Sequence, residues 1–240
     1  MKIAEKSSKC RDTLLRLGQN RVVAQALPVA FLVAITLLFA AMTNGRFIDP
    51  INLKQILDQA LIVGTVATGA SFIFGTGNVN IAMGSCTALT CTVAAKVYVA
   101  TNSVLVMIVT ALLFGIALLM CCALLSTTLH VRVMFVTIVM MVLLSNIHEE
   151  LLGGTTLQLP FEMTGALKKA GAPYILFGVF FVFCLLLFHG TWVGRAIKMT
   201  GSNQTCAEQT GIFRNTCLLI AFLVAGIGVG CGALITIIRT

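Results

Sequence analysis

Charged residues are scarce in this sequence. Asp, Glu, Lys and Arg make up 10% of the 240 residues, and only eight residues are acidic, whereas about a quarter of a soluble domain is charged. Hydrophobic residues make up 58%, and several apolar runs reach the ~20 residues that a helix needs to cross a bilayer. Their evenly apolar character excludes a transmembrane barrel, whose strands alternate between apolar and polar residues. The sequence therefore predicts an all-α, polytopic helical membrane protein.

Motifs for catalysis and metal binding are also missing. The nine cysteines form no CxxC pair and no Cys/His metal spacing, and His148-Glu149-Glu150 lacks the HExxH spacing. No phosphate-binding loop and no nucleophile–base pair is present. We therefore predict that the chain is not an enzyme and has no catalytic residue, metal or cofactor. We expect the cysteines to pack as small hydrophobes and residues 148–150 to form a solvated span end.

Seven hydrophobic segments divide the chain into a basic tail, residues 1–21, and a transmembrane domain, residues 22–240. The segment at 60–74 is short for a span, and it follows a polar stretch in which Asp49-Pro50-Ile51-Asn52 predicts the start of a helix. Glycines from Gly226 to Gly232 lie inside the last segment and indicate close helix packing. The segments cover residues 22–42, 60–74, 81–100, 104–125, 133–147, 173–188 and 218–238.

The basic residues predict the orientation of the chain. The formal net charge is +8, and six Lys and Arg residues precede the first hydrophobic segment, between Lys2 and Arg21. Under the positive-inside rule this places the N-terminus in the cytoplasm. We expect a multi-pass protein of the cell membrane that does not bind nucleic acid, because the positive charge lies in this tail and no soluble domain carries it.

A glycine-rich break interrupts the apolar sequence after the second segment. Gly75, Gly77, Asn78 and Asn80 fall within six residues, and Gly84 and Ser85 follow. Backbone groups freed by a break at membrane depth need partners within the protein, so such breaks often line a cavity or a transport pathway. A tight turn at the membrane surface is the alternative interpretation. We therefore predict a broken or re-entrant region near residues 75–85.

A polar island separates the last two segments, from His189 to Ile212. It is longer than a connection between two spans requires, which indicates a docking element at residues 189–213. Gly201 and Gly211 are placed to start and stop a short helix, with Asn203 as its N-cap. An amphipathic helix that lies on the membrane is the alternative. The candidate docking residues are Gly194, Arg195, Gly201, Asn203, Ala207, Glu208 and Gly211.

Three motifs resemble the ribose-type permeases of bacterial ABC importers, in the monosaccharide and branched-chain amino acid superfamily. Asn52 to Leu57 and Thr76 to Ser85 match an Asn-Leu-x-x-Ile-Leu motif and a Thr-Gly-Gly-Ile-Asp-Leu-Ser-Val-Gly-Ser signature. The island is similar to the family's Gly-Arg-Ala … Gly-Gly-Asn … Ala-Ala … Gly-Ile loop. Arg132 to Thr137 also fits the family's pattern. The chain departs from the family at Asn80-Ile81-Ala82, where Asp-Leu-Ser is usual, and at Ser202 and Cys206.

The resemblance implies a permease subunit that translocates a sugar or similar small polar solute. Its implied partners are a separate ABC ATPase subunit, an extracytoplasmic solute-binding protein and a second permease chain. The island would contact the ATPase, and the break would lie beside the pathway. Family members continue for several more spans, so a C-terminally truncated permease is expected. A permease for branched-chain amino acids or nucleosides, and a non-transporting membrane fragment or scaffold, are the alternatives.

Overall fold

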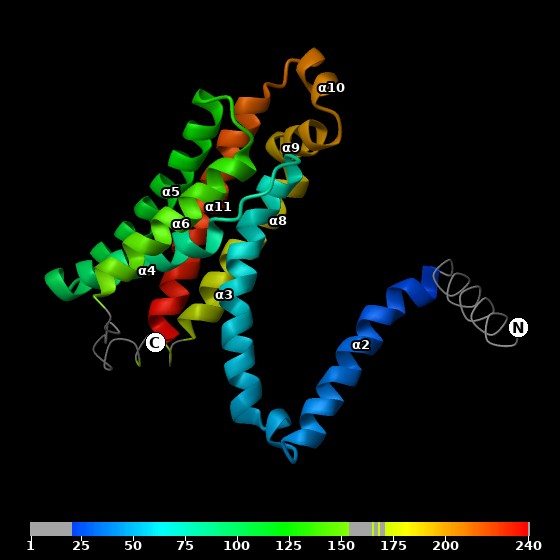
Figure 1. Ribbon diagram of the computed structural model, residues 1–240, viewed down its shortest axis with the longest axis vertical. Helices are drawn as coiled ribbons and strands as arrows, with labels where there is room; N and C mark the ends of the chain where they lie inside the picture. The colour runs from blue at the N-terminus through cyan, green and yellow to red at the C-terminus, as the bar shows by residue number, and fades with distance from the viewer. Residues whose placement is uncertain (1–20, 154–164, 166–167, 169–170, 240) are drawn as a thin grey trace, which may run out of the picture. The chain divides into compact units, whose positions relative to one another are not determined.

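The computed structural model describes residues 21–153, 165, 168 and 171–239 (Figure 1). No strand occurs among these residues, and six of their helices are long and apolar enough to cross a membrane. The predicted all-α, polytopic fold is therefore confirmed. The predicted tail lies outside the described residues, apart from Arg21.

The chain divides into two units between Leu57 and Asp58. The first unit holds α2 (Arg21–Met42), the short 3₁₀ helix η1 (Arg46–Ile48) and the beginning of α3 (Pro50–Gly75). The predicted helix start is confirmed, because the Asp49 carbonyl accepts a hydrogen bond from the Leu53 N–H at 2.9 Å. Large apolar side chains on α2 are exposed, which is typical of a helix that faces lipid.

The prediction that the second segment, residues 60–74, is short for a span is wrong. Helix α3 has 26 residues, because it continues through the polar residues that precede Ala60. Asp58 and Gln59 border the apolar run, yet their backbone N–H and C=O groups continue the helical hydrogen bonding. A drop in hydropathy therefore does not mark the end of this helix.

The second unit contains the rest of α3 and the helices that follow it. The five predicted segments from residue 81 onward fall on these helices, except that α4 begins two residues later than predicted, and the polar island forms two more. The described helices are α4 (Met83–Thr101), α5 (Val104–Thr128), α6 (Val133–Leu152), α8 (Ala172–Gly190), α9 (Trp192–Ser202), α10 (Gln204–Gln209) and α11 (Arg214–Arg239).

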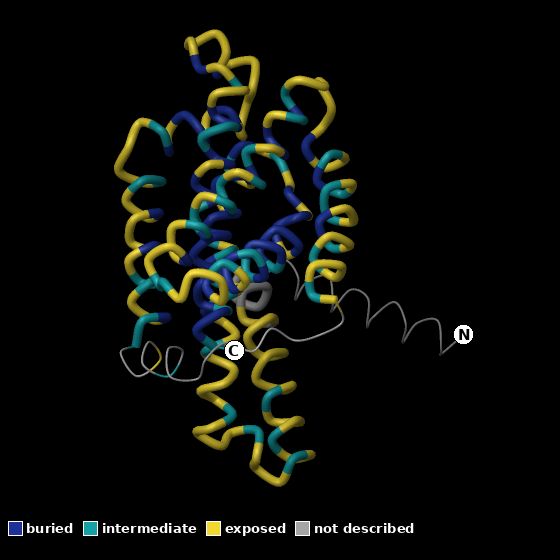
Figure 2. Tube along the Cα trace, turned by 90° about the vertical axis from the view of Figure 1, so that its left-hand side faces the viewer, coloured by how far each residue is buried: buried dark blue, intermediate teal, exposed yellow. Residues whose placement is uncertain are grey.

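Helix α11 lies at the centre of the second unit, and most of its residues from Leu218 onward are buried (Figure 2). A Cβ atom on Gly230 would lie 2.9 Å from the backbone oxygen of Ala111 in α5. A Cβ on Gly228 would lie 3.2 Å from the Cα of Gly69 in α3. The glycines therefore let α11 approach two neighbouring backbones directly, which confirms the predicted helix packing.

The turns of the second unit gather at two ends. The α5–α6 turn and the start of α11 line one cavity, which holds residues such as His130 and Arg214. The α3–α4 break contacts α9 at this same end. At the other end, Lys96 in α4 donates a hydrogen bond to the Leu151 carbonyl in α6. Successive spans therefore cross the unit in alternating directions (Figure 1).

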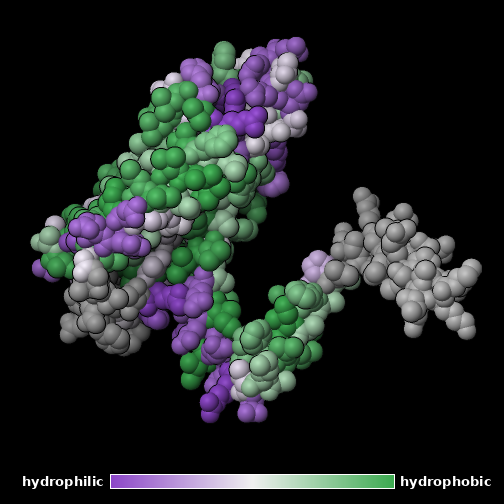
Figure 3. Space-filling model, viewed as in Figure 1, coloured by the Kyte–Doolittle hydropathy of each residue, from purple (hydrophilic) through white to green (hydrophobic). Residues whose placement is uncertain are grey.

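The surface of the second unit fits a membrane environment. Apolar side chains cover its flank in Figure 3, and polar ones gather at the α9–α10 end. The eight described cysteines are free, and five of them are buried, in agreement with a packing role.

Candidate functional site

The break between α3 and α4 supplies its own hydrogen-bond partners. Helix α3 ends at Gly75, and Gly77 has a φ of +77°, a conformation that favours glycine. The Asn78 side chain donates from Nδ2 to the Thr76 carbonyl at 3.2 Å and to the Thr76 hydroxyl at 3.0 Å. These bonds give polar groups at the end of α3 partners within the break itself, as non-helical backbone at membrane depth would need.

Asn80 holds the second half of the break. Its side chain is 7% exposed, and its Oδ1 accepts a hydrogen bond from the Ala82 N–H at 2.8 Å. The neighbouring Ile81 N–H donates to the Thr137 hydroxyl of α6 at 3.4 Å. Asn80 therefore fixes the turn into α4, while Thr137 ties that turn to α6.

A groove of about 660 Å³ opens beside the break, between α3 and α4. Most of its lining is aliphatic, such as Val66 and Ala70 of α3. Of the residues predicted for the pathway, Asn80 and Gly84 line the groove. Gly75, Gly77, Asn78 and Ser85 do not, and the buried Ser85 hydroxyl donates to the Ala82 carbonyl at 3.0 Å.

Three polar residues of the groove were missed at the level of sequence: Thr87, His148 and Thr236. They come from α4, α6 and α11. The prediction that His148 belongs to a solvated span end is wrong, because its Nδ1 lies 2.8 Å from the Thr92 hydroxyl of α4 and its side chain is half-buried. Glu149 and Glu150 are exposed, as predicted. No sequence signal connects these residues, since they meet only when the three helices pack.

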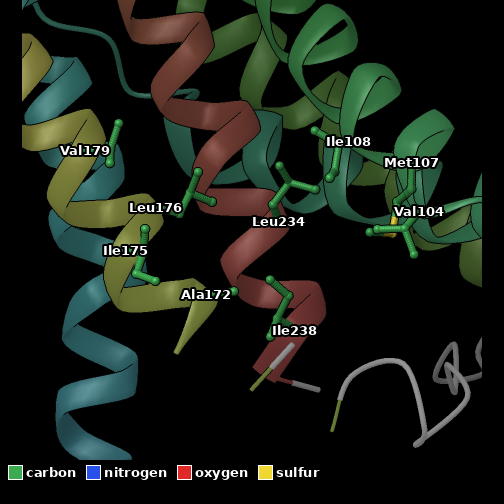
Figure 4. Close-up of a pocket in the computed structure, with 9 residues that line it drawn as sticks. All are labelled: Val104, Met107, Ile108, Ala172, Ile175, Leu176, Val179, Leu234 and Ile238. Atoms are coloured by element: carbon green, nitrogen blue, oxygen red, sulfur yellow. The ribbon is translucent and has the colours of Figure 1, made fainter. Parts of the chain in front are cut away.

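A second cavity offers no polar group. It measures about 370 Å³ and lies between α5, α8 and α11, and its described lining residues are all apolar (Figure 4). Leu176, Leu234 and Met107 are among the labelled side chains. Such a lining suits lipid chains and cannot hydrogen-bond a polar solute. The described residues also contain no group of three or more His, Cys, Asp or Glu side chains that could hold a metal ion.

The polar island folds into α9 and α10. Helix α9 starts after Thr191, whose hydroxyl oxygen accepts from the Gly194 N–H at 3.4 Å. A Cβ on Gly194 would overlap the Phe188 carbonyl oxygen, so only glycine fits the tight turn from α8. One face of α9 is buried, including Ala196 and Ile197, while Arg195 is exposed.

Helix α10 presents a polar surface. Asn203 is its N-cap, as predicted, and its Oδ1 accepts from the Cys206 N–H at 3.1 Å. Ala207 is buried beneath the helix, and the exposed Glu208 accepts a hydrogen bond from Gln204 at 3.0 Å. Gly211 follows with a φ of +83°, in the stop position predicted for it.

Gly201 does not start this helix, contrary to the prediction. It lies in the last turn of α9, where a Cβ would overlap the carbonyl oxygen of Gly75. Glycine is needed here for close contact rather than for a helix start. Helix α9 is strongly amphipathic, but the predicted docking helix began only at Gly201.

The break and the island touch each other at this point. A Cβ placed on Gly201 would contact Gly75 and would also lie 3.3 Å from the backbone nitrogen of Gly77. Ile197 packs against Gly75 from the preceding turn of α9, because a Cβ on Gly75 would lie 2.8 Å from its Cγ2 atom. The two features that the sequence singled out separately therefore form one continuous contact.

The family of the chain follows from comparison with known proteins. A family model described as "Branched-chain amino acid transport system / permease component" matches residues 52–240. The chain belongs to this permease family. It is therefore the membrane-spanning component of a transport system rather than an enzyme, and the resemblance to ribose-type permeases is confirmed.

Individual relatives are similar over most of the chain. It is 26% identical over 220 residues to the ribose import permease protein RbsC of Escherichia coli (strain K12). The aligned region covers 88% of this chain and 68% of that protein. The protein of the same name from Haemophilus influenzae (strain ATCC 51907 / DSM 11121 / KW20 / Rd) is 24% identical over 205 residues, 81% of this chain and 64% of that protein. No solved structure matches the chain.

Replacing Asn80 tests the structure of the break. Asn80→Leu removes the acceptor of the buried Ala82 N–H and should lower the free energy of unfolding by about 1–3 kcal/mol. Asn80→Asp keeps an acceptor next to the N-terminus of α4, where helix dipoles favour a carboxylate, and should be tolerated. Thermal unfolding in detergent and abundance in the membrane measure both effects. Val79→Leu at the exposed neighbouring position is the control, and equal stability of all three variants would contradict the assignment.

Proposed function

We propose that this permease carries a neutral sugar, such as ribose or a related monosaccharide, through the groove between α3 and α4. The similarity to the ribose import permeases supports the substrate class. The described groove residues include the amide of Asn80, the Thr87 hydroxyl and the His148 ring, but no Asp, Glu, Lys or Arg. These groups can hydrogen-bond a sugar. They offer no opposite charge for the ammonium and carboxylate groups of an amino acid, which favours a sugar over a branched-chain amino acid.

The chain would work with an ABC ATPase subunit that hydrolyses ATP and a solute-binding protein that delivers the sugar. A second permease chain would complete the pathway. The exposed polar face of α10, with Gln204 and Glu208, is the proposed contact for the ATPase. The contact of Gly201 with Gly75 would then carry a movement of α9 to the break and from there to the groove.

The N-terminus and the α9–α10 end are proposed to face the cytoplasm. The basic tail supports this orientation, and the ATPase contact requires it. Cys206 is exposed on α10, so a membrane-impermeant maleimide should label it in inside-out vesicles and not in intact cells. Cys206→Ser identifies the signal, and labelling of Cys206 from outside intact cells would rule the orientation out.

Filling the groove tests the pathway. Gly84 lies on α4 at the groove, and no atom lies within 4 Å of a Cβ placed there. Gly84→Leu should therefore fold normally but occupy the space of the solute and abolish uptake. Gly178→Leu on α8 is the matched control, because Gly178 is also helical with open space at its Cβ and does not line the groove.

Uptake of radiolabelled ribose is measured in cells that also produce the ATPase and the binding protein, and is divided by the amount of permease in the membrane. Normal uptake by Gly84→Leu would reject this groove as the pathway. Loss of uptake in both variants would show that the added leucine acts through the fold, and would also count against the proposal.

The coupling contact is tested by the smallest possible change. Gly201→Ala places a methyl group against the Gly75 carbonyl, and relief of such overlap typically costs about 1–3 kcal/mol. Sugar-stimulated ATP hydrolysis should fall, because α9 must move away from the break. Gly190→Ala, at a position with open space, should leave it unchanged. If Gly201→Ala assembles with the ATPase as well as the wild type does and its ATP hydrolysis is stimulated by sugar to the wild-type level, the coupling role is disproved.

A further inference from the structure

A small polar cavity lies at the α9–α10 end of the second unit, apart from the groove. Its volume is about 140 Å³, and it lies between the end of α5, the start of α6 and the start of α11. A cavity of this size holds ordered water or one small polyatomic ion. The polar residues that line it are Ser126, Thr127, His130, Arg132, Arg214 and Asn215.

The α5–α6 turn gives this cavity a fixed wall. The Ser126 hydroxyl donates to the Val131 carbonyl at 2.8 Å, and the Val131 N–H donates to the Ser126 carbonyl at 3.2 Å. His130, between them, has a φ of +54°, and its Nδ1 lies 3.1 Å from the Thr128 carbonyl oxygen. The turn is held by its own hydrogen bonds, so the cavity exists before a ligand enters.

The charges around the cavity are uncompensated. Arg132 directly precedes α6 and Arg214 begins α11, and neither helix has an acidic residue in its first turn. Helix N-termini carry partial positive charge and favour anions there, so an arginine at each of these starts is electrostatically unfavourable by itself. Neither guanidinium forms an ion pair or a hydrogen bond with another described residue. Two helix N-termini and two arginines thus converge, and no acidic side chain of the described residues pairs with them.

Exposed apolar residues border the cavity along the chain. Leu129 precedes His130, Phe135 lies one turn after Arg132, and Phe213 precedes Arg214; these side chains are 62%, 59% and 72% exposed. A ligand with an anionic group and apolar chains would contact both the cavity and this border. A phospholipid has that composition, and basic cavities between transmembrane helices are suited to anionic headgroups.

We propose that this cavity binds a phosphate group, supplied by a membrane phospholipid, between Arg132 and Arg214. The phosphate oxygens would accept hydrogen bonds from both guanidiniums and from the side-chain amide of Asn215. Charge-assisted bonds of this kind are stronger than neutral ones. The bound phosphate would neutralise the two helix starts and anchor α6 and α11 to one leaflet. This site does not depend on which solute the permease carries.

Native mass spectrometry of the delipidated full-length chain in neutral detergent tests the proposal. Phosphatidylglycerol should bind, whereas diacylglycerol with the same acyl chains should not, because it lacks the phosphate. Arg132→Gln with Arg214→Gln should weaken phosphatidylglycerol binding about tenfold or more. Arg46→Gln with Arg239→Gln removes the same charge at residues that do not line the cavity and should leave the affinity unchanged. Arg132→Lys with Arg214→Lys should retain much of the binding, and thermal unfolding verifies that each variant is folded.

Inorganic phosphate identifies the source of the group. Binding of inorganic phosphate that depends on the two arginines, without arginine-dependent lipid binding, would assign the cavity to the free anion. The absence of arginine-dependent binding of either ligand would overturn the proposal. The proposal would also be overturned if the variant with both glutamine substitutions no longer assembled with the ATPase but bound lipid normally. The two arginines would then bind an acidic surface of the ATPase.

Discussion

Direct contact between helix backbones at α11 is the constraint on which the second unit depends. Inside a bilayer, association of helices gains little from apolar burial alone, so close van der Waals packing between small residues becomes important. Gly226 and Gly230 bring α11 against the backbone of α5, and Gly228 brings it against Gly69 of α3. A side chain at any of these positions would separate the helices. The burial of α11, and the positions of the spans around it, follow from these contacts.

The same kind of contact reaches the surface of the unit. Because α3 is held against α11 at Gly69, its end at Gly75 lies where α9 passes, and Gly201 allows the two backbones to meet. Gly194 allows the sharp turn that brings α9 back over α8. Glycine contacts therefore connect the central helix, the break and the island in series. A continuous series of close backbone contacts therefore joins α9 to the residues beside the groove.

The uncharged and the charged polar groups of this unit lie in different cavities. The groove holds amide, hydroxyl and imidazole groups such as those of Asn80, Thr87 and His148, where a charged group would be costly to bury. The guanidiniums of Arg132 and Arg214 lie instead at helix starts. Uncharged groups can hydrogen-bond a neutral solute, whereas arginines can form charge-assisted hydrogen bonds with an anion. The permease thus contains two polar cavities with distinct chemistry.

The sequence alone determined the membrane class, the order of the spans, the broken region near Gly77, the Asn203 cap and the membership of the permease family. Each of these rests on hydropathy, backbone conformation or motifs within a few neighbouring residues. Tertiary structure decided the rest. It placed His148 in the groove and within hydrogen-bond distance of Thr92. It also set Gly201 against Gly75 and brought Arg132 and Arg214 to one cavity. These pairs are distant in sequence, and their meeting depends on how the helices pack, which no local pattern encodes.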